Sequence, residues 1–262
     1  MKTCVVILNC NLSDWTNRLY ESLKPYEQSG NYELMVFDNG STGNGISKYT
    51  TYKSEENLYF GGGFNAGMQM VLEDDRYDSM LFLNNDLTIH PYNFVKTLRE
   101  AMFHRVGFMT DSYHTIMTDY DIVSPCFYNV EPNGQCFWRT MHCWNSSSIR
   151  AVPFVDFQSP LISRRLLNEI KEIPVDLKYG FGIDTLFSIT CKQKGYRMGV
   201  LDNVCILHHN SMTIKSGVAG LTIPEYCRRA EEGQRKFFSE RGLTKEFNEV
   251  RQAGESYTAY LT

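Results

Sequence analysis

The sequence lacks any apolar stretch close to the roughly 20 residues that a helix needs to span a bilayer. It also lacks a basic excess, because 26 Lys and Arg stand against 30 Asp and Glu, a formal net charge of −4. A nucleic-acid binder needs that excess to offset phosphates, so we expect no nucleic-acid partner. The N-terminal run Cys4-Val5-Val6-Ile7-Leu8 is too short for a signal peptide and predicts a first buried strand.

No Cys-x-x-Cys pair occurs among the eight cysteines, which argues against a zinc knuckle. Several cysteines fall within expected strands or helices, where a free thiol behaves as a small hydrophobe. We therefore expect a reduced cytosolic protein, with or without a place at the cytoplasmic face of a membrane. A disulfide between Cys136 and Cys143 is an alternative that the sequence does not exclude. The length of 262 residues suits one large α/β domain, alone or with a small extension.

The first hundred residues alternate strand and helix patterns, which predicts an α/β fold with a mostly parallel central sheet. Strands are expected at residues 3–8, 32–37 and 79–83. Ser13 could cap the first intervening helix. The apolar faces of the three expected helices recur at three- or four-residue spacing: Trp15, Leu19 and Leu23; Phe64, Met68, Val71 and Leu72; Phe94, Val95, Leu98 and Met102.

Residues 106–155 are strand-like and aromatic, and we expect a β-layer with its own core there. One or two of Phe137, Trp138, Trp144 and Phe154 could instead form a platform on which a sugar stacks. Helices are expected at 163–170, 184–194 and 225–240, and strands near 197–201 and 204–207; the last twenty residues are polar and weakly patterned.

These patterns divide the chain into a domain at 1–220 and a C-terminal helical extension at 221–262. The domain splits into halves at 1–105 and 106–220. The helix of the extension could cover the second half or pair two copies of the chain in a homodimer.

The tripeptide Asn84-Asn85-Asp86 ends a short apolar strand. A buried strand that ends in an acid brings a carboxylate to the rim of a sheet, where α/β proteins bind ligands. Oxygen ligands suit a hard divalent cation, and such a cation suits a diphosphate. Taken alone, the tripeptide is also an ordinary turn sequence.

Three further polar clusters belong to the same part of the chain. Asn9-Cys10-Asn11 follows the first strand, Asp38-Asn39-Gly40-Ser41-Thr42-Gly43 follows the second, and Gly61 to Gly67 opens a helix. The ends of parallel strands meet at one edge of a sheet, so we expect the clusters to converge on one crevice.

The glycine run also satisfies the loose dinucleotide fingerprint as Gly61-x-Gly63-x-x-Ala66. That fingerprint belongs to the first strand–helix turn of its unit, and here two such units come earlier. We therefore favour a different interpretation, in which the glycines let the backbone approach a nucleotide or sugar closely and the amides at the helix start face an anion.

Taken together, these segments resemble the family 2 glycosyltransferases, which have the GT-A fold. The resemblance covers about residues 1–215 and includes Asp184 within Tyr179-Gly180-Phe181-Gly182-Ile183-Asp184, the segment from Cys191 to Arg197, and His208-His209-Asn210-Ser211. The form Leu83-Asn84-Asn85-Asp86 is most similar to the rhamnosyltransferase-like branch, which transfers deoxysugars onto bacterial-type surface glycans.

The resemblance implies an inverting enzyme that uses a UDP-, dTDP- or GDP-linked sugar and a glycan or glycolipid acceptor. It implies that 1–105 is the nucleotide-binding half of the domain and 106–220 the acceptor-side half, which the C-terminal helix could cover. It implies that Asp86 ligates Mg²⁺ or Mn²⁺, with His208 or His209 as a further ligand, and that Asp184 is the general base. It also implies a donor-binding set, in which Asn65 and the glycines support the sugar or diphosphate: Asn9, Asn11, Asp38, Asn39, Ser41, Asn57, Gly63, Asn65 and Asn85.

Three positions depart from the family pattern. Asn84 stands where many relatives carry a first acid, and Ile183 and Leu186 replace acids on either side of the base. These departures leave open a catalytically silent module that binds nucleotide or glycan. A nucleotidylyltransferase is a further alternative, although no N-terminal glycine-rich loop that ends in Arg is present.

Overall fold

Strands and helices alternate through the first half of the chain, as the sequence predicts. The computed structural model describes residues 1–90, 93–103, 119–129, 137–144, 149–209, 212 and 220–257. The elements of the first half are β1 (Lys2–Asn9), α1 (Ser13–Leu23), η1 (Lys24–Tyr26), α2 (Glu27–Gly30), β2 (Tyr32–Asn39), η2 (Gly43–Gly45), β3 (Tyr52–Ser54), α3 (Tyr59–Leu72), β4 (Tyr77–Asn84), β5 (Leu87–Ile89) and α4 (Phe94–Phe103).

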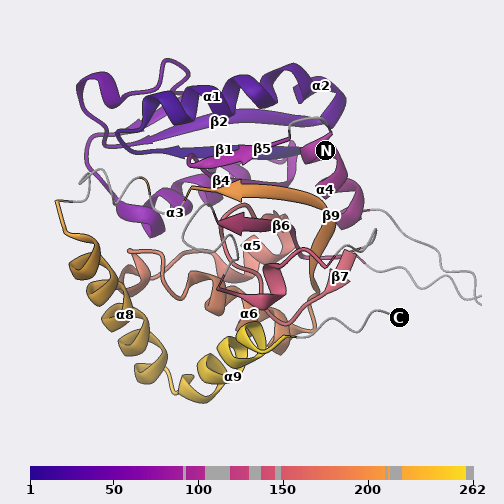
Figure 1. Ribbon diagram of the computed structural model, residues 1–262, viewed down its shortest axis with the longest axis vertical. Coiled ribbons are helices and arrows are strands. Elements are labelled where there is room, and N and C mark those ends of the chain that lie inside the picture. Colours follow the sequence, from indigo (N-terminus) through magenta and orange to yellow (C-terminus); the bar gives the residue numbers. More distant parts are fainter. Residues whose placement is uncertain are drawn as a thin grey trace, which may run out of the picture.

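The second half completes the same sheet and adds helices at its far end. Its elements are β6 (Ile122–Asn129), η3 (Arg139–Met141), β7 (Ile149–Ala151), β8 (Leu161–Ser163), α5 (Arg164–Ile170), η4 (Val175–Leu177), α6 (Ile183–Lys194), β9 (Met198–His208), α8 (Ile223–Glu240) and α9 (Thr244–Glu255). In Figure 1, α8 and α9 lie at the end of the molecule opposite α1 and α2.

One mixed sheet runs through the described part of the protein, in the order β3-β2-β1-β4-β8-β6-β9-β5, with β7 paired to β9. The pairs β1–β2, β1–β4, β2–β3 and β6–β9 are parallel, whereas β4–β8, β6–β8, β5–β9 and β7–β9 are antiparallel. The expected α/β class with a helix-flanked central sheet is confirmed, and the parallel pairing is concentrated in its first half.

The central strands have continuous apolar runs because both faces of the sheet are covered. Residues Thr3 to Ile7 of β1 are fully buried. Helix α1 packs against β1 and β5, and α3 packs against β4 and β1. Since β1, β2 and β4 are parallel neighbours, Asn9, Asn39 and Asn84 all end their strands at the same edge of the sheet.

Two local expectations were wrong. Ser13 does not cap α1; its hydroxyl instead donates to the carbonyl of Asn44 at 2.7 Å. The middle of the chain does not form a layer with its own core, because β6 belongs to the central sheet and Trp138 and Phe154 join the one large core. Residues 106–118 of that segment lie outside the described part.

Helix α9 falls in the stretch that the sequence pattern leaves unassigned. Phe247, Val250 and Gly254 form its buried face, and the two side chains join the main core. Gly254 lets the helix approach the rings of Phe154 and Trp138, because a Cβ there would lie 3.0 Å from the first and 3.1 Å from the second. The core therefore runs through the proposed domain and its extension, and the boundary at 220 stays a prediction.

None of the helices within the described ranges is both long and apolar enough to cross a membrane. The cysteines that the structure describes are free thiols. Cys136 lies outside the described residues, so its disulfide with Cys143 stays a prediction.

Candidate active site

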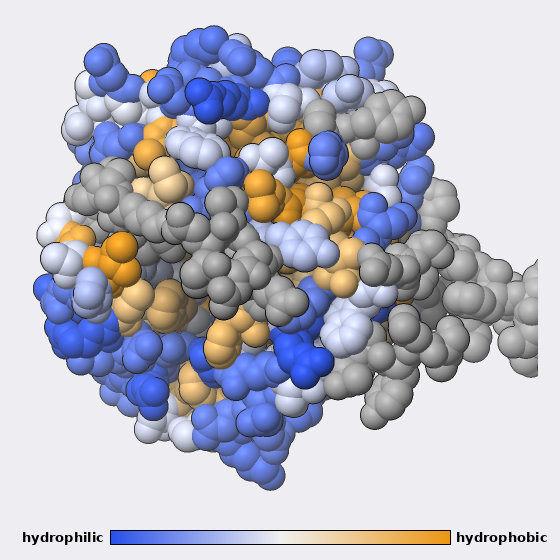
Figure 2. All heavy atoms as spheres, viewed as in Figure 1, coloured by the Kyte–Doolittle hydropathy of each residue, from blue (hydrophilic) through white to orange (hydrophobic). Residues whose placement is uncertain are grey.

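A cavity of about 430 Å³ opens at the carboxyl ends of β1, β2 and β4. This is the edge at which the polar clusters were expected to meet. Its walls also come from the segments that precede α6, from the end of β9, and from α8 and α9. In the view of Figure 2, apolar residues gather in the middle of the molecule, with hydrophilic residues above and below them. The predicted site residues that line the cavity are Asn39, Asn57, Asn85, Asp86, Asp184 and His208.

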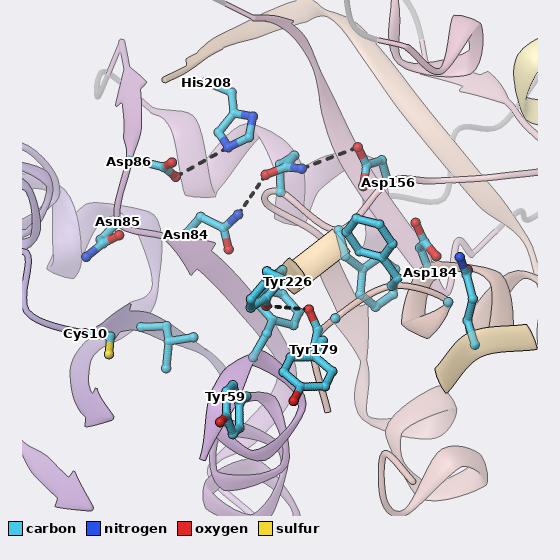
Figure 3. A pocket seen from close by; sticks show the side chains of 18 of the residues that line it. Cys10, Tyr59, Asn84, Asn85, Asp86, Asp156, Tyr179, Asp184, His208 and Tyr226 are labelled. Atoms are coloured by element: carbon cyan, nitrogen blue, oxygen red, sulfur yellow. Dashed lines mark hydrogen bonds and ion pairs between the residues drawn. The ribbon is translucent and has the colours of Figure 1, made fainter. Parts of the chain in front are cut away.

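The side chains of Asn84, Asn85 and Asp86 take three different directions at the end of β4 (Figure 3). Asn84 Nδ2 donates to Gln158 Oε1 at 2.7 Å, and Asn85 Nδ2 donates to Thr16 Oγ1 at 3.0 Å. Both asparagines therefore fix the rim of the cavity, and the carboxylate of Asp86 is the charged group of the three.

Asp86 and His208 form a pair at this side of the cavity. Asp86 Oδ1 lies 3.4 Å from His208 Nε2, and Oδ2 accepts a hydrogen bond from the amide of Met212 at 3.1 Å. Burial raises the pKa of the Asp86 carboxyl, but His208 and the Met212 amide outweigh it, and the net pKa is below the usual value. The carboxylate is thus ionised at neutral pH.

His209 turns its ring elsewhere. Its Nε2 is 2.8 Å from the hydroxyl of Thr88, and its ring centroid lies 4.5 Å from that of Trp15. Its backbone amide donates to the carbonyl of Asp86 at 2.9 Å. The residue therefore holds the chain that follows β9 against the end of β4. Among the described residues no group of three or more His, Cys, Asp and Glu side chains is placed to hold a metal ion.

A second acidic pair lies across the cavity, where Asp184 opens α6 and Asp156 follows the buried residue Val155 (Figure 3). Burial and the nearby charge of Asp156 raise the pKa of Asp184 to about 7, against the pull of the Thr185 amide and of Arg251. Asp184 Oδ1 accepts from Thr185 N at 2.6 Å. Burial also raises the pKa of Asp156.

Asp156 was missed by the sequence reasoning. The signal was present, because an acid that directly follows the apolar run Phe154-Val155 repeats the pattern that drew attention to Asp86. A hydrogen-bonded relay joins the two sides of the cavity: Asn84 donates to Gln158, whose Nε2 donates to Asp156 Oδ2 at 3.4 Å.

Asn9, Asp38 and Ser41 form a buried network behind the cavity. Asn9 Nδ2 donates to Asp38 Oδ2 at 2.7 Å and to Ser41 Oγ at 3.2 Å. Thr16 Oγ1 donates to Asn9 Oδ1 at 2.8 Å and accepts from Asn85, so the network reaches the cavity wall. Asn11 joins it through its amide, which donates to Ser41 Oγ, and through its side chain, which accepts from Thr42 N. These residues hold three loops together.

Asn39 and Asn57 shape the wall where α3 begins. Asn39 Nδ2 donates to the carbonyl of Tyr59 at 2.9 Å, and Asn39 Oδ1 accepts from Leu58 N. Asn57 Oδ1 accepts from Tyr59 N, which starts the helix at a residue with a positive φ of 57°. The ring of Tyr59 then stands beside that of Tyr179, at a centroid distance of 4.8 Å.

The structure does not bring Gly63 or Asn65 to the cavity. Helix α3 already begins at Tyr59, so the glycines lie inside it, and a Cβ at Gly63 would meet the side chain of Leu8. Asn65 accepts from the amide of Ile173 at 2.6 Å and donates to its carbonyl at 3.0 Å. The glycine-rich start of α3 thus permits close packing against neighbouring protein segments.

Two of the four aromatic residues proposed as a sugar platform do line the cavity. Phe137 is 65% exposed and Trp138 is largely buried, and their ring centroids are 4.9 Å apart. Phe154 is fully buried in the core, and Trp144 donates its ring N–H to the carbonyl of Arg139.

No protein-family model matches the sequence. The curated proteins contain no match either.

Solved structures do resemble the chain. S. aureus TarS 1-349 in complex with UDP is 18% identical, with a TM-score of 0.53 over 91% of this chain and 72% of that one. The same protein in complex with UDP-GlcNAc is 17% identical, with a TM-score of 0.52 over 97% and 82% of the two chains. GalNAc-T7 with UDP, GalNAc and Mn²⁺ is 13% identical, with a TM-score of 0.55 over 97% and 55%. At such low sequence identity the structural similarity establishes the fold alone, and this chain has the GT-A fold.

Proposed function

We propose that this protein is an inverting, metal-dependent glycosyltransferase, which moves a sugar from a nucleotide diphosphate to an acceptor hydroxyl. The observation that carries the proposal is one cavity with two unlike sides. Asp86 and His208 offer a carboxylate and an imidazole at the first, and Asp156 and Asp184 offer two acids at the second. The first set suits a diphosphate with its cation, and the second suits removal of a proton.

The donor side fits Mg²⁺ or Mn²⁺. Such a cation binds through one or two protein groups and takes its remaining ligands from phosphates and water. Asp86 supplies an ionised carboxylate at the cavity wall, with the ring of His208 beside it. These two residues would hold the metal, and a bound cation would neutralise the charge that develops on the departing diphosphate. His209 is left out, because its ring bonds to Thr88.

The choice of nucleotide follows the structural neighbours. The TarS structures hold UDP or UDP-GlcNAc, and the GalNAc-T7 structure holds UDP, GalNAc and Mn²⁺. We therefore place UDP-sugars first, ahead of the dTDP- and GDP-linked sugars that the sequence left open. The sugar itself and the rhamnosyltransferase-like assignment stay predictions.

Asp184 would accept the proton of the acceptor hydroxyl. A general base works best when its pKa lies close to the operating pH, and the pKa of Asp184 is about 7. Asp184 faces Asp86 across the cavity (Figure 3). An acceptor oxygen activated there would attack the anomeric carbon on the face away from the diphosphate, and the configuration at that carbon would invert.

The test is hydrolysis of UDP-, dTDP- and GDP-sugars in the absence of acceptor, with Mn²⁺ or Mg²⁺ and then with EDTA. We expect slow, metal-dependent release of one nucleoside diphosphate. Asp86→Ala should reduce this release at least about 100-fold, because a metal contributes several kcal/mol to such a step. Glu55→Ala, which removes an exposed acid away from the cavity, is the matched control.

Two other results would count against the proposal. Tight binding of a nucleotide with no turnover, together with no measurable consequence of Asp184→Asn, would support the silent module instead. If no nucleotide binds at all, the assignment fails as a statement about function.

A further inference from the structure

A second cavity, of about 360 Å³, lies between α8 and α9 and adjoins the first. Glu231, Gln234 and Arg251 line both. Arg251 belongs to the wall near Asp184, since its charge acts on the pKa of that carboxyl. The second cavity, which we call the α8–α9 groove, therefore leads away from the proposed general base and along the C-terminal helices.

The groove offers hydrogen-bonding groups that the protein does not use itself. Within the described part of the chain, the side chains of five lining residues have no hydrogen-bond or ion-pair partner: Glu231 and Arg235 from α8, and Asn248, Gln252 and Glu255 from α9. The amide oxygen of Gln234, a buried residue, accepts from Arg251 at 3.4 Å.

Several charges of the same helix outside the groove are paired with other side chains. Glu225 bonds to both Arg228 and Arg229, Arg228 also bonds to Glu232, and Lys236 bonds to Asp176. On α8, by contrast, the side chains of Glu231 and Arg235 have no such partner among the described residues, and both line the groove.

The lining has the chemistry of a site for an uncharged polyhydroxyl ligand. Two carboxylates, Glu231 and Glu255, are balanced by the guanidinium groups of Arg235 and Arg251, and side-chain amides lie between them. An anionic ligand would require a basic excess, and a lipid tail would require apolar walls. The volume is within the range of sites that hold small organic ligands.

Arg251, one of the two charged residues that line both cavities, also lies close to aromatic rings. The guanidinium carbon of Arg251 lies 4.9 Å from the ring centroid of Trp138 and 5.5 Å from that of Phe247. This stacking holds the guanidinium in place, with its donors at the junction between the cavity and the groove.

We propose that the α8–α9 groove binds the part of the acceptor that does not react, and that the acceptor is a neutral oligosaccharide of at least two sugar units. Its terminal hydroxyl would lie at Asp184, and the following sugars would occupy the groove. This inference rests on the proposed function. In Figure 2 the surface over the lower part of this face, where α8 and α9 lie in the same view, is largely hydrophilic.

The test measures binding, so it does not depend on turnover. Maltotetraose, cellotetraose, N-acetylchitotetraose and their monosaccharides are titrated into the full chain in the presence of UDP and Mn²⁺, and followed by calorimetry. We expect at least one tetrasaccharide to bind about tenfold or more tightly than its monosaccharide. The double variant Asn248→Ala/Gln252→Ala should lose that gain, since each lost hydrogen bond weakens binding about fivefold.

The matched control is Lys245→Ala, which removes an exposed polar side chain from the same helix outside the groove. It should keep the preference for the tetrasaccharide. Titration of UDP alone reports on the proposed function separately, so a failure there is distinguishable from a failure of the groove. Equal tetrasaccharide affinity in the double variant, preference for octyl glucoside or tetragalacturonate, or binding of none of the neutral saccharides would overturn the proposal.

Discussion

The carboxyl group of Asp156 raises the pKa of Asp184 from across a short stretch of the cavity, in addition to the larger effect of burial. Two neighbouring acids whose ionised forms burial already disfavours cannot both ionise easily, since each charge disfavours the other. Asp184 is consequently a group whose protonation changes near neutral pH, although an ordinary aspartate loses its proton far below that range.

Asp184→Asn should remove the proposed base without disturbing its surroundings. Asparagine retains an oxygen that can accept from Thr185 N, as Asp184 Oδ1 does now. We expect the rate of sugar transfer to fall about 10²- to 10⁴-fold, the usual contribution of general base catalysis. Nucleotide affinity, measured by calorimetry, should stay within about twofold of wild type. An undiminished transfer rate would remove Asp184 from the mechanism.

The same substitution should stabilise the protein above pH 7. Between about pH 4 and pH 7 the native state keeps the Asp184 proton while the unfolded chain has lost it, so the free energy of unfolding falls as pH rises. Asparagine has no such penalty. A gain of about 1 kcal/mol corresponds to a rise of about 2–4 °C in Tm at pH 8. Thermal unfolding at about pH 3 or below, under the pKa of Asp184 in both the native and the unfolded state, should show little difference between the two proteins.

The proposed transfer activity of the wild-type protein should increase as pH rises through about 7, because Asp184 must lose its proton before it can act as the proposed base. Asp156→Asn removes the neighbouring charge, so the pKa of Asp184 falls and the rise should move to lower pH. The measurement is the pH profile of kcat/KM for both proteins. An identical profile in the variant would mean that Asp156 does not act on the base.

The two histidines at the end of β9 should respond differently to substitution. His208→Ala removes the group 3.4 Å from Asp86 and should raise the Mn²⁺ concentration needed for half-maximal activity about tenfold or more. His209→Ala should leave that concentration within about twofold, and lower Tm through loss of the bond to Thr88. If the two variants lose Mn²⁺ affinity equally, His209 belongs to the metal site after all.

Gly40 and Gly43 provide a matched pair for the loop that follows β2. Both have positive φ, 74° and 51°, so alanine at either position costs about 1–2 kcal/mol of backbone strain. A Cβ at Gly40 would also collide with the backbone of Glu56 and Asn57, whereas one at Gly43 would meet nothing within 4 Å. Gly40→Ala should therefore lower Tm more than Gly43→Ala, and weaken nucleotide binding, because Asn57 lines the cavity.

The strand ends were predictable because their signal is local. The buried runs of β1, β2 and β4 and the polar residues after them fix both the elements and the edge at which they meet. What each polar residue does at that edge depends on neighbours that are distant in sequence. Asn9 and Asp38 have the residue types of ligand contacts, and the structure shows them bonded to each other.

The second half was harder to predict because its order in the sheet does not follow its order in sequence. Strand β8 is inserted between β4 and β6, which brings Asp156 and Gln158 alongside the end of β4. No period in the sequence encodes that insertion. Helix α9 was missed because its apolar face consists of only two large side chains, Phe247 and Val250, among polar residues.

The charge of Arg251 acts on the pKa of Asp184, so a residue of α9 bears on the pH at which that carboxyl ionises. Arg251 lowers the pKa of Asp184 from a position far along the chain, on an element that contributes no strand to the sheet. Substitutions at Arg251, or at the Trp138 and Phe247 rings beside it, should shift the pH at which Asp184 ionises. The side of the cavity that holds Asp86 and His208 would keep its structure. A protein that evolved in a more acidic or more alkaline environment could thus change the pKa of Asp184 through residue 251, without a substitution among the proposed reacting groups.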